Sequence, residues 1–212
     1  DYDDNWVGRF HGIKSDLMTI EVNPSIVYKV TDWLSVSAGG SAQWMHAELT
    51  QSIWIPGYGE APSKITGDGW AGGANAGLTV KYHETGRIGF HWRSEISQSI
   101  SGNMRVYDTI RSPVEADITL PQSFSVGIYQ RFWGKLKDLA LMADYTFTGW
   151  NSFQSLDIVN SNTGDIVSST PENWKNTSRI SVGMHYYIDE WTLRMGLAYD
   201  ESPVRSPEYR TV

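Results

Sequence analysis

The sequence contains no cysteine, so it offers no disulfide bond and no thiolate for a metal ion or for nucleophilic catalysis. This absence is compatible with an oxidising compartment without requiring one. Positive charges are outnumbered, because 17 Lys and Arg stand against 24 Asp and Glu and give a formal net charge of −7 at pH 7. A chain with this balance is poorly suited to broad electrostatic binding of nucleic acid, and we expect no nucleic-acid partner.

Long apolar runs are missing as well. No stretch approaches the ~18 consecutive apolar residues that a membrane-spanning helix needs. Signals for helices are weak throughout, and no signal peptide is visible at Asp1, which processing or truncation would explain. These absences fit a soluble protein, but they also fit a membrane barrel, whose strands are apolar on one face only.

Aromatic residues and strand patterns are abundant. The chain has 10 Trp and 11 Tyr, residue types that favour membrane–water interfaces. Alternating patterns predict eight strands: Met18–Val30, Leu34–Leu49, Gly69–Tyr82, Arg87–Ser101, Glu115–Phe132, Leu139–Trp150, Thr177–Ile188 and Trp191–Glu201. Short connections alternate with longer loops near 50–68, 102–114 and 151–176. This alternation is typical of outer-membrane barrels, which have short periplasmic turns and long outer loops.

The two faces of the predicted strands differ in polarity. Alternate positions such as Ile20, Trp44, Leu78, Leu141 and Val182 are apolar, and only Gln130 on this face is strongly polar. The opposite positions carry charged and small polar residues. A soluble sheet with one wet face is the alternative. The strand length of 12–14 residues, about a bilayer core when tilted, and aromatics at both strand ends favour a transmembrane barrel. The aromatics form two predicted interfacial belts: Tyr28, Trp33, Tyr82, Phe132, Trp133, Tyr187 and Trp191 at the short periplasmic turns, and Trp44, Trp70, Trp150, Trp174 and Tyr199 toward the long outer loops.

Several short motifs follow one another in a specific order along the chain. They are Asn23-Pro24-Ser25, Ala47-Glu48-Leu49-Thr50, Gly67-Asp68-Gly69-Trp70, Trp92-Arg93-Ser94-Glu95, Ala143-Asp144-Tyr145-Thr146 and Ala198-Tyr199-Asp200-Glu201-Ser202-Pro203. Together they resemble the FadL-type family of outer-membrane transport proteins for long-chain fatty acids and aromatic hydrocarbons. The resemblance covers the chain from about Asp16 to its end.

The resemblance implies an all-β, antiparallel, transmembrane barrel wall in the bacterial outer membrane. Family members have fourteen strands and an N-terminal hatch with an Asn-Pro-Ala motif, which has no counterpart here. We therefore expect residues 1–212 to be a single domain and a fragment of such a barrel. Closure of these eight strands alone remains an alternative; its interior would be nearly filled by side chains.

Charged positions on the polar face are candidates for substrate binding in the lumen. The cationic and histidine candidates are Lys29, Lys81, Arg87, His91, Arg93, Arg131, Arg179 and Arg194. A cationic wall suits a carboxylate-headed substrate, whereas the alternative is that these groups pair with each other or with a plug. In the long loop near 50–68, the apolar residues Ile53, Trp54, Ile55 and Tyr58 are candidates for a landing site, or for packing on the loop itself.

Two other motifs give weaker evidence of a function. Residues 67–72 match G-x-G-x-x-G but lack the strand-then-helix context of a nucleotide site, and His83-Glu84 lacks the second histidine of a zinc protease. We expect no metal, no cofactor and no catalysis, and a monomer in contact with outer-membrane lipid and lipopolysaccharide. The predicted function is passive transport of hydrophobic compounds, foremost long-chain fatty acids. The alternatives are aromatic hydrocarbon uptake, a structural or adhesive barrel, and an outer-membrane phospholipase.

Overall fold

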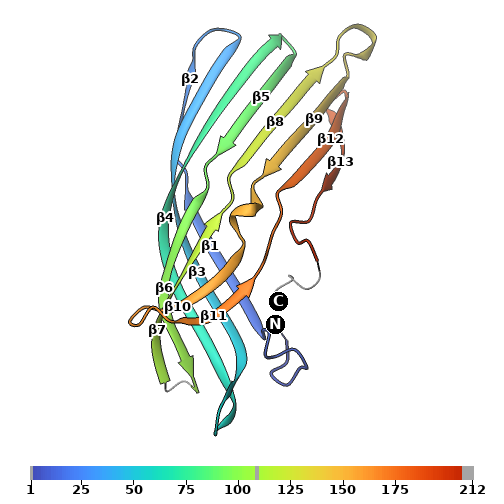
Figure 1. The fold of residues 1–212 in the computed structure, drawn as a ribbon. Coiled ribbons are helices and arrows are strands. Elements are labelled where there is room, and N and C mark those ends of the chain that lie inside the picture. Colours follow the sequence, from blue (N-terminus) through green and yellow to red (C-terminus); the bar gives the residue numbers. More distant parts are fainter. Residues whose placement is uncertain (1, 108–109, 207–212) are drawn as a thin grey trace.

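The computed structural model describes residues 2–107 and 110–206, and its strands form one antiparallel sheet of thirteen segments (Figure 1). The strands are β1 (Lys14–Val22), β2 (Ser25–Lys29), β3 (Leu34–Ile55), β4 (Gly59–His83), β5 (Gly86–Arg93), β6 (Ile96–Val106), β7 (Ile110–Leu120), β8 (Ser123–Arg131), β9 (Leu139–Thr148), β10 (Ser155–Asn160), β11 (Ile166–Pro171), β12 (Thr177–Ile188) and β13 (Trp191–Asp200). Two single 3₁₀ turns, η1 (Gly134–Leu136) and η2 (Trp150–Ser152), complete the elements. Within the described part of the chain, no helix has the length and apolar character of a transmembrane helix.

The segments join end to end into eight long strands. β3, β4 and β13 are continuous, whereas β1 continues into β2, β5 into β6, β7 into β8, β9 into β10 and β11 into β12, each after a short break. The end of β4 nearer the short turns pairs with β5, and the opposite end pairs with β6. In Figure 1 the short turns gather at one end of the wall and the β3–β4 and β10–β11 hairpins at the other.

The breaks fall where the backbone loses ladder hydrogen bonds. Proline has no N–H to donate, and Pro24 and Pro121 stand between β1 and β2 and between β7 and β8. Other groups satisfy the neighbouring chain: the Gly40 N–H donates to the Pro24 carbonyl at 3.3 Å, and the Ala74 N–H donates to the Ser94 Oγ at 2.9 Å. The breaks therefore cost few unpaired backbone groups.

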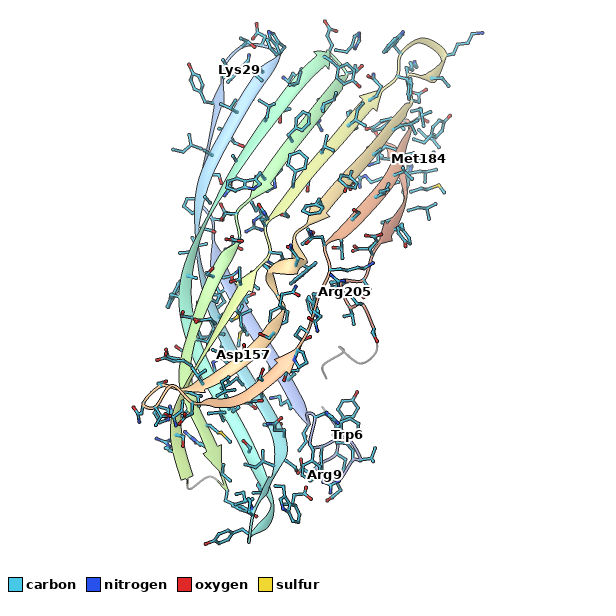
Figure 2. The ribbon with its side chains drawn as sticks, in the orientation of Figure 1. Trp6, Arg9, Lys29, Asp157, Met184 and Arg205 are labelled. Carbon is cyan, nitrogen blue, oxygen red and sulfur yellow. The ribbon has the colours of Figure 1, made fainter. Side chains whose placement is uncertain are left out.

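The outward face confirms the predicted apolar surface. One register row crosses all eight strands and contains only apolar and aromatic side chains: Tyr28, Val36, Leu78, Phe90, Val126, Tyr145, Ile180 and Tyr199. Met184 points away from the wall on this face (Figure 2). The polar exception, Gln130, accepts a 2.8 Å hydrogen bond from the Tyr82 hydroxyl and donates to the Thr85 Oγ1 at 3.2 Å.

The edge of the apolar surface gives the tilt of the strands. It lies at Ile20 on β1 and at Tyr199 on β13, and Tyr199 shares its register row with Tyr28. The edge therefore moves eight residues, from position 20 to position 28, over seven steps between strands. At ~3.3 Å per residue and ~4.8 Å per step, this is a tilt of about 40°, as in transmembrane barrels.

Three predicted loops are wrong. The segments 50–68, 102–114 and 151–176 contain the ends of β3 and β4, the ends of β6 and β7, and the β10–β11 hairpin. In these segments polar residues take the outward positions and apolar residues take the inward ones, which is the reverse of the membrane segment. The apolar outward face therefore does not extend through them. The glycines of residues 67–72 lie within β4, so this motif is part of a strand and not of a nucleotide-binding loop.

Candidate functional site

The wall changes its polarity beyond the row that contains Trp44 and Trp70. On the membrane side of this row, apolar side chains point outward; beyond it, the outward positions of β3 are His46 and Glu48. The inward positions there become apolar, as at Met45, which is 3% exposed. Apolar outward residues suit lipid and polar ones suit water, so this row marks the outer membrane boundary.

The apolar inward face beyond the boundary lines a cavity of about 300 Å³. Its apolar lining comes from β1, β3, β4, β6, β7 and β10, from the η2 turn and from the chain after β11. It consists of Leu17, Met45, Ala47, Leu49, Ile65, Ile100, Val114, Ala116, Ile118, Leu120, Trp150, Phe153, Leu156, Ile158 and Trp174. Four of these, Met45, Ile100, Val114 and Ile158, are among the eight buried apolar residues in the described part of the chain. The cavity therefore overlaps the hydrophobic core of the wall.

An aromatic corner closes one side of this cavity. The Trp174 ring lies 4.8 Å from Trp150 and 5.0 Å from Phe153, both in edge contacts. The Trp174 Nε1–H donates to the Glu172 Oε2 at 3.0 Å, and Glu172 is 1% exposed. Trp150 and Trp174 were predicted to belong to the outer interfacial belt; this is wrong, because the η2 turn and the chain after β11 carry them inward.

Polar side chains separate the cavity from the lumen at membrane depth. The Gln98 Nε2 donates to the Gln43 Oε1 at 3.0 Å, and both residues are buried. Next to them, Arg93 forms an ion pair with Glu21, and Asn75 donates to the Asn23 Oδ1 at 2.7 Å. These groups occupy the inward positions that follow the cavity residues along β1, β3 and β6.

The N-terminal segment forms part of the cavity rim. His11 and Gly12 line the cavity, and the Trp6 Nε1–H donates to the Gly12 carbonyl at 3.0 Å. Arg9 donates to both carboxylate oxygens of Glu60, at 2.5 and 2.9 Å. These hydrogen bonds lower the pKa of Glu60 to about 2. Trp6 and Arg9 lie at the opposite end of the wall from Lys29 (Figure 2).

The eight predicted lumen residues lie outside this cavity. Arg93 is paired with Glu21, and the Lys29 Nζ lies 2.5 Å from the Asp32 Oδ1 beside a short turn. His91 and Arg179 share a register row across β5, β8, β9 and β12. Lys81 is opposite Arg87, and Arg194 is opposite His185.

Two of these candidates, Arg87 and Arg131, each lie over an aromatic ring. The Arg87 Cζ lies 4.9 Å from the centre of the Tyr129 ring, and the Arg131 Cζ lies 4.5 Å from that of Tyr187. Tyr187, which was predicted to belong to the periplasmic aromatic belt, therefore faces the lumen. Its neighbour Tyr186 is on the outward face.

The predicted landing residues occupy the tip of the β3–β4 hairpin. Ile53, Trp54 and Ile55 end β3, and Tyr58 is in the turn. Trp54 is 69% exposed and Tyr58 84% exposed, so two of the four present aromatic surface to the outside.

Sequence reasoning missed the cavity itself. A signal was present: on β6, Ser97, Ser99 and Ser101 alternate with the buried residues Ile96, Gln98 and Ile100. An unbroken continuation of β5 would place the serines inward, but the break after Arg93 shifts the register against β4 by one residue, so the serines face outward and Ile96, Gln98 and Ile100 face inward. Among the described residues, no group of three or more His, Asp and Glu side chains could hold a metal ion.

A tilted antiparallel wall with an apolar band between two aromatic rows, and a polar inner face at the same depth, defines a bacterial outer-membrane β-barrel. The sequence matches the family described as outer membrane protein transport protein (OMPP1/FadL/TodX) over residues 1–211. The chain belongs to this family, and its location is the outer membrane.

Individual relatives agree with this assignment. A long-chain fatty acid transport protein of Escherichia coli O6:H1 is 29% identical over 96% of this chain and 54% of its own length. A 47 kDa outer membrane protein of Pasteurella multocida is 27% identical over 100% of this chain and 56% of its own. This chain thus spans about half the length of the curated relatives it matches.

Solved structures share the fold. A Pseudomonas aeruginosa FadL homologue superposes with a TM-score of 0.86 at 25% identity, covering 96% of this chain and 54% of the homologue. The Ralstonia pickettii toluene transporter TbuX gives a TM-score of 0.69 at 22% identity, over 88% of this chain and 56% of TbuX.

Proposed function

We propose that the protein transports hydrophobic compounds passively across the outer membrane, and that long-chain fatty acids are its principal substrates. The observation that carries the proposal is the apolar cavity beyond the outer membrane boundary, in a part of the wall whose outward face is polar. An apolar inner surface surrounded by a water-facing exterior extracts a hydrophobic solute from water before it reaches the membrane.

The polarity of the inner face changes from the outer surface toward the periplasm. The apolar cavity comes first, followed by the Gln43–Gln98 and Glu21–Arg93 groups, and then by a basic lumen. An alkyl chain suits the cavity, and a carboxylate suits the cationic wall beneath it. The named relatives include a long-chain fatty acid transport protein, which supports this substrate class.

Aromatic hydrocarbons are the second candidate substrate. The cavity contains one cationic side chain, Lys14, whose ammonium lies 3.1 Å from Glu48 and 3.4 Å from Asp16. A cavity without an unpaired cation does not require a charged ligand. Relatives of the same fold include a toluene transporter and a monoaromatic hydrocarbon channel.

The test is uptake by the complete reading frame in a strain that lacks its own fatty acid uptake protein. Growth on oleate, with oleate accumulation that does not depend on cellular energy, is the expected result. Uptake of toluene without oleate would favour the second candidate. If the cells take up neither oleate nor toluene, a structural or adhesive barrel is favoured. We expect no catalysis, and release of fatty acid from phospholipid by the purified protein would contradict this.

A further inference from the structure

A row of cationic side chains lies on the outward face of the wall, beyond the outer membrane boundary. Lys64 on β4 is directly opposite Arg105 on β6, and Arg105 is directly opposite Arg111 on β7. Residues directly opposite each other in an antiparallel pair point to the same face of the sheet. Lys64 is an even number of positions from the outward-facing Trp70 on the continuous strand β4, so all three cations face outward. These three residues are here called the basic row.

The basic row has too few acidic partners in the part of the chain that the structure describes. The Lys64 Nζ lies 2.8 Å from Glu48, but Lys14 pairs with the same carboxylate at 3.1 Å. No carboxylate of the described residues lies within ion-pair distance of Arg105 or Arg111, and the buried Arg105 Nε has no hydrogen-bond acceptor. Like charges directly opposite each other destabilise a sheet, so this arrangement favours an anion bound from outside.

The height of the basic row above the membrane boundary restricts the kind of anion. Lys64 precedes the boundary residue Trp70 by six positions, which is roughly 15 Å at ~3.3 Å per residue and a tilt of about 40°. Closer to the boundary, Asp68 and Glu115 are exposed in one outward register row and repel anions there. In the outer leaflet, the phosphates of lipid A lie at the boundary, whereas the phosphates of the lipopolysaccharide sugar core lie farther out. The basic row is therefore at the height of the core.

We propose that the basic row binds a phosphate group in the core oligosaccharide of lipopolysaccharide, the glycolipid of the outer leaflet. Clusters of lysine and arginine just outside a membrane attract anionic headgroups, and arginine binds phosphate oxygens bidentately. Arg111 is exposed and Arg105 is half-buried beside it, so one phosphate can contact both guanidinium groups. This site holds the glycolipid against the outward face of the wall, and it is independent of what the lumen transports.

The test uses the complete, purified protein in detergent at constant ionic strength. It compares two lipopolysaccharides, one with a phosphorylated core and one with the same core without its phosphates. The double variant Arg105→Gln/Arg111→Gln is expected to bind the phosphorylated form about ten-fold more weakly than wild type and the other form within about two-fold. Lipid A alone, which ends at the membrane boundary, should bind equally well to the wild type and to this variant.

The matched control is Lys135→Gln/Lys137→Gln. It also removes two exposed cations, but from the η1 turn and its end, at the opposite end of the wall. It is expected to change the affinity for none of the three glycolipids. Heat-modifiable migration on a gel verifies that each variant is folded.

Four results would overturn the proposal. Equal affinity of the wild type for both lipopolysaccharides would show that the core phosphates are not recognised. Unchanged affinity of the arginine variant for the phosphorylated form would place the phosphate elsewhere on the wall. Equal weakening for both forms would indicate general damage to the outer part of the wall. A ten-fold loss of lipid A binding by the arginine variant would move the site from the core to the membrane boundary.

Discussion

Glu21 on β1 and Arg93 at the end of β5 form an ion pair across the inner face, 72 positions apart in the sequence. β3 and β4 lie between their strands, so the two side chains reach over two strands to meet. The pair lies where the apolar cavity gives way to the basic lumen. Both charges belong to the polar face predicted from the alternation, but the pairing itself depends on the curvature of the sheet.

Reversal of the charge at Arg93 provides the first prediction. Arg93→Glu places two carboxylates together and removes the first cation below the cavity. We expect oleate uptake to fall about ten-fold, the scale of one lost charge-assisted hydrogen bond, and toluene uptake to change less than two-fold. The exchange variant Glu21→Arg/Arg93→Glu restores a cation and should recover part of the oleate uptake. Equal loss for both substrates would discard a headgroup role for Arg93.

The cavity provides the second prediction through two adjacent residues on opposite faces of β6. Ile100 is 5% exposed and lines the cavity, whereas Ser101 faces outward between Asp68 and Glu115 in the register. Ile100→Lys should destabilise the wall by about 2–4 kcal/mol and abolish binding of the alkyl chain, because it buries an unpaired charge. Ser101→Lys should stay within about 0.5 kcal/mol of wild type. Urea unfolding and oleate titration measure both effects, and similar losses for the two variants would contradict the proposed cavity.

The membrane part of the fold could be predicted from the sequence because lipid imposes a simple rule. Every outward position there must be apolar, so a period of two reveals the strands and both faces. Gln130, the one exception, required the structure, since its partner Tyr82 is 48 positions away and Thr85 is 45 away.

The site could be predicted only in part. Beyond Trp44 and Trp70 water surrounds the wall, so polar residues face outward there and apolar residues face inward. An apolar position in the alternating pattern therefore indicates the inner face instead of the outer one. The cationic lumen residues were identifiable by their phase, but their partners were not. Whether Arg93 has an acidic neighbour and Arg131 an aromatic one depends on contacts between strands that are distant in the sequence.

The lipid face provides the third prediction, again from neighbouring residues. Val126 lies in the apolar row that crosses the wall, and Ser125 on the same strand faces the lumen, with its Oγ 2.9 Å from the Thr146 Oγ1. Val126→Lys should reduce the free energy of unfolding in lipid by about 2–4 kcal/mol, the cost of a cation near the bilayer midplane. Ser125→Lys should cost clearly less, because its ammonium remains in the lumen. A larger loss for Ser125→Lys would reverse the assignment of the faces.

The Arg9–Glu60 contact provides the fourth prediction, on pH. The pKa of Glu60 is about 2 in the folded protein, below the ordinary carboxylate value of 4.5, because Arg9 donates hydrogen bonds to the ionised form. A lowered pKa means that the contact stabilises the N-terminal segment above pH ~4.5 and that this stabilisation disappears as the pH falls toward 2.

Amide hydrogen exchange measures this change where the segment is anchored. The Ile13 N–H donates to the Thr50 carbonyl at 2.7 Å, and the Ser52 N–H donates to the Arg9 carbonyl at 2.9 Å. After correction for intrinsic exchange rates, protection of both amides should decrease between pH 4.5 and 2. In Glu60→Gln the protection should be lower at neutral pH and flat across this range, because no charge is left to titrate. Full pH dependence in that variant would show that another group controls the rim of the cavity.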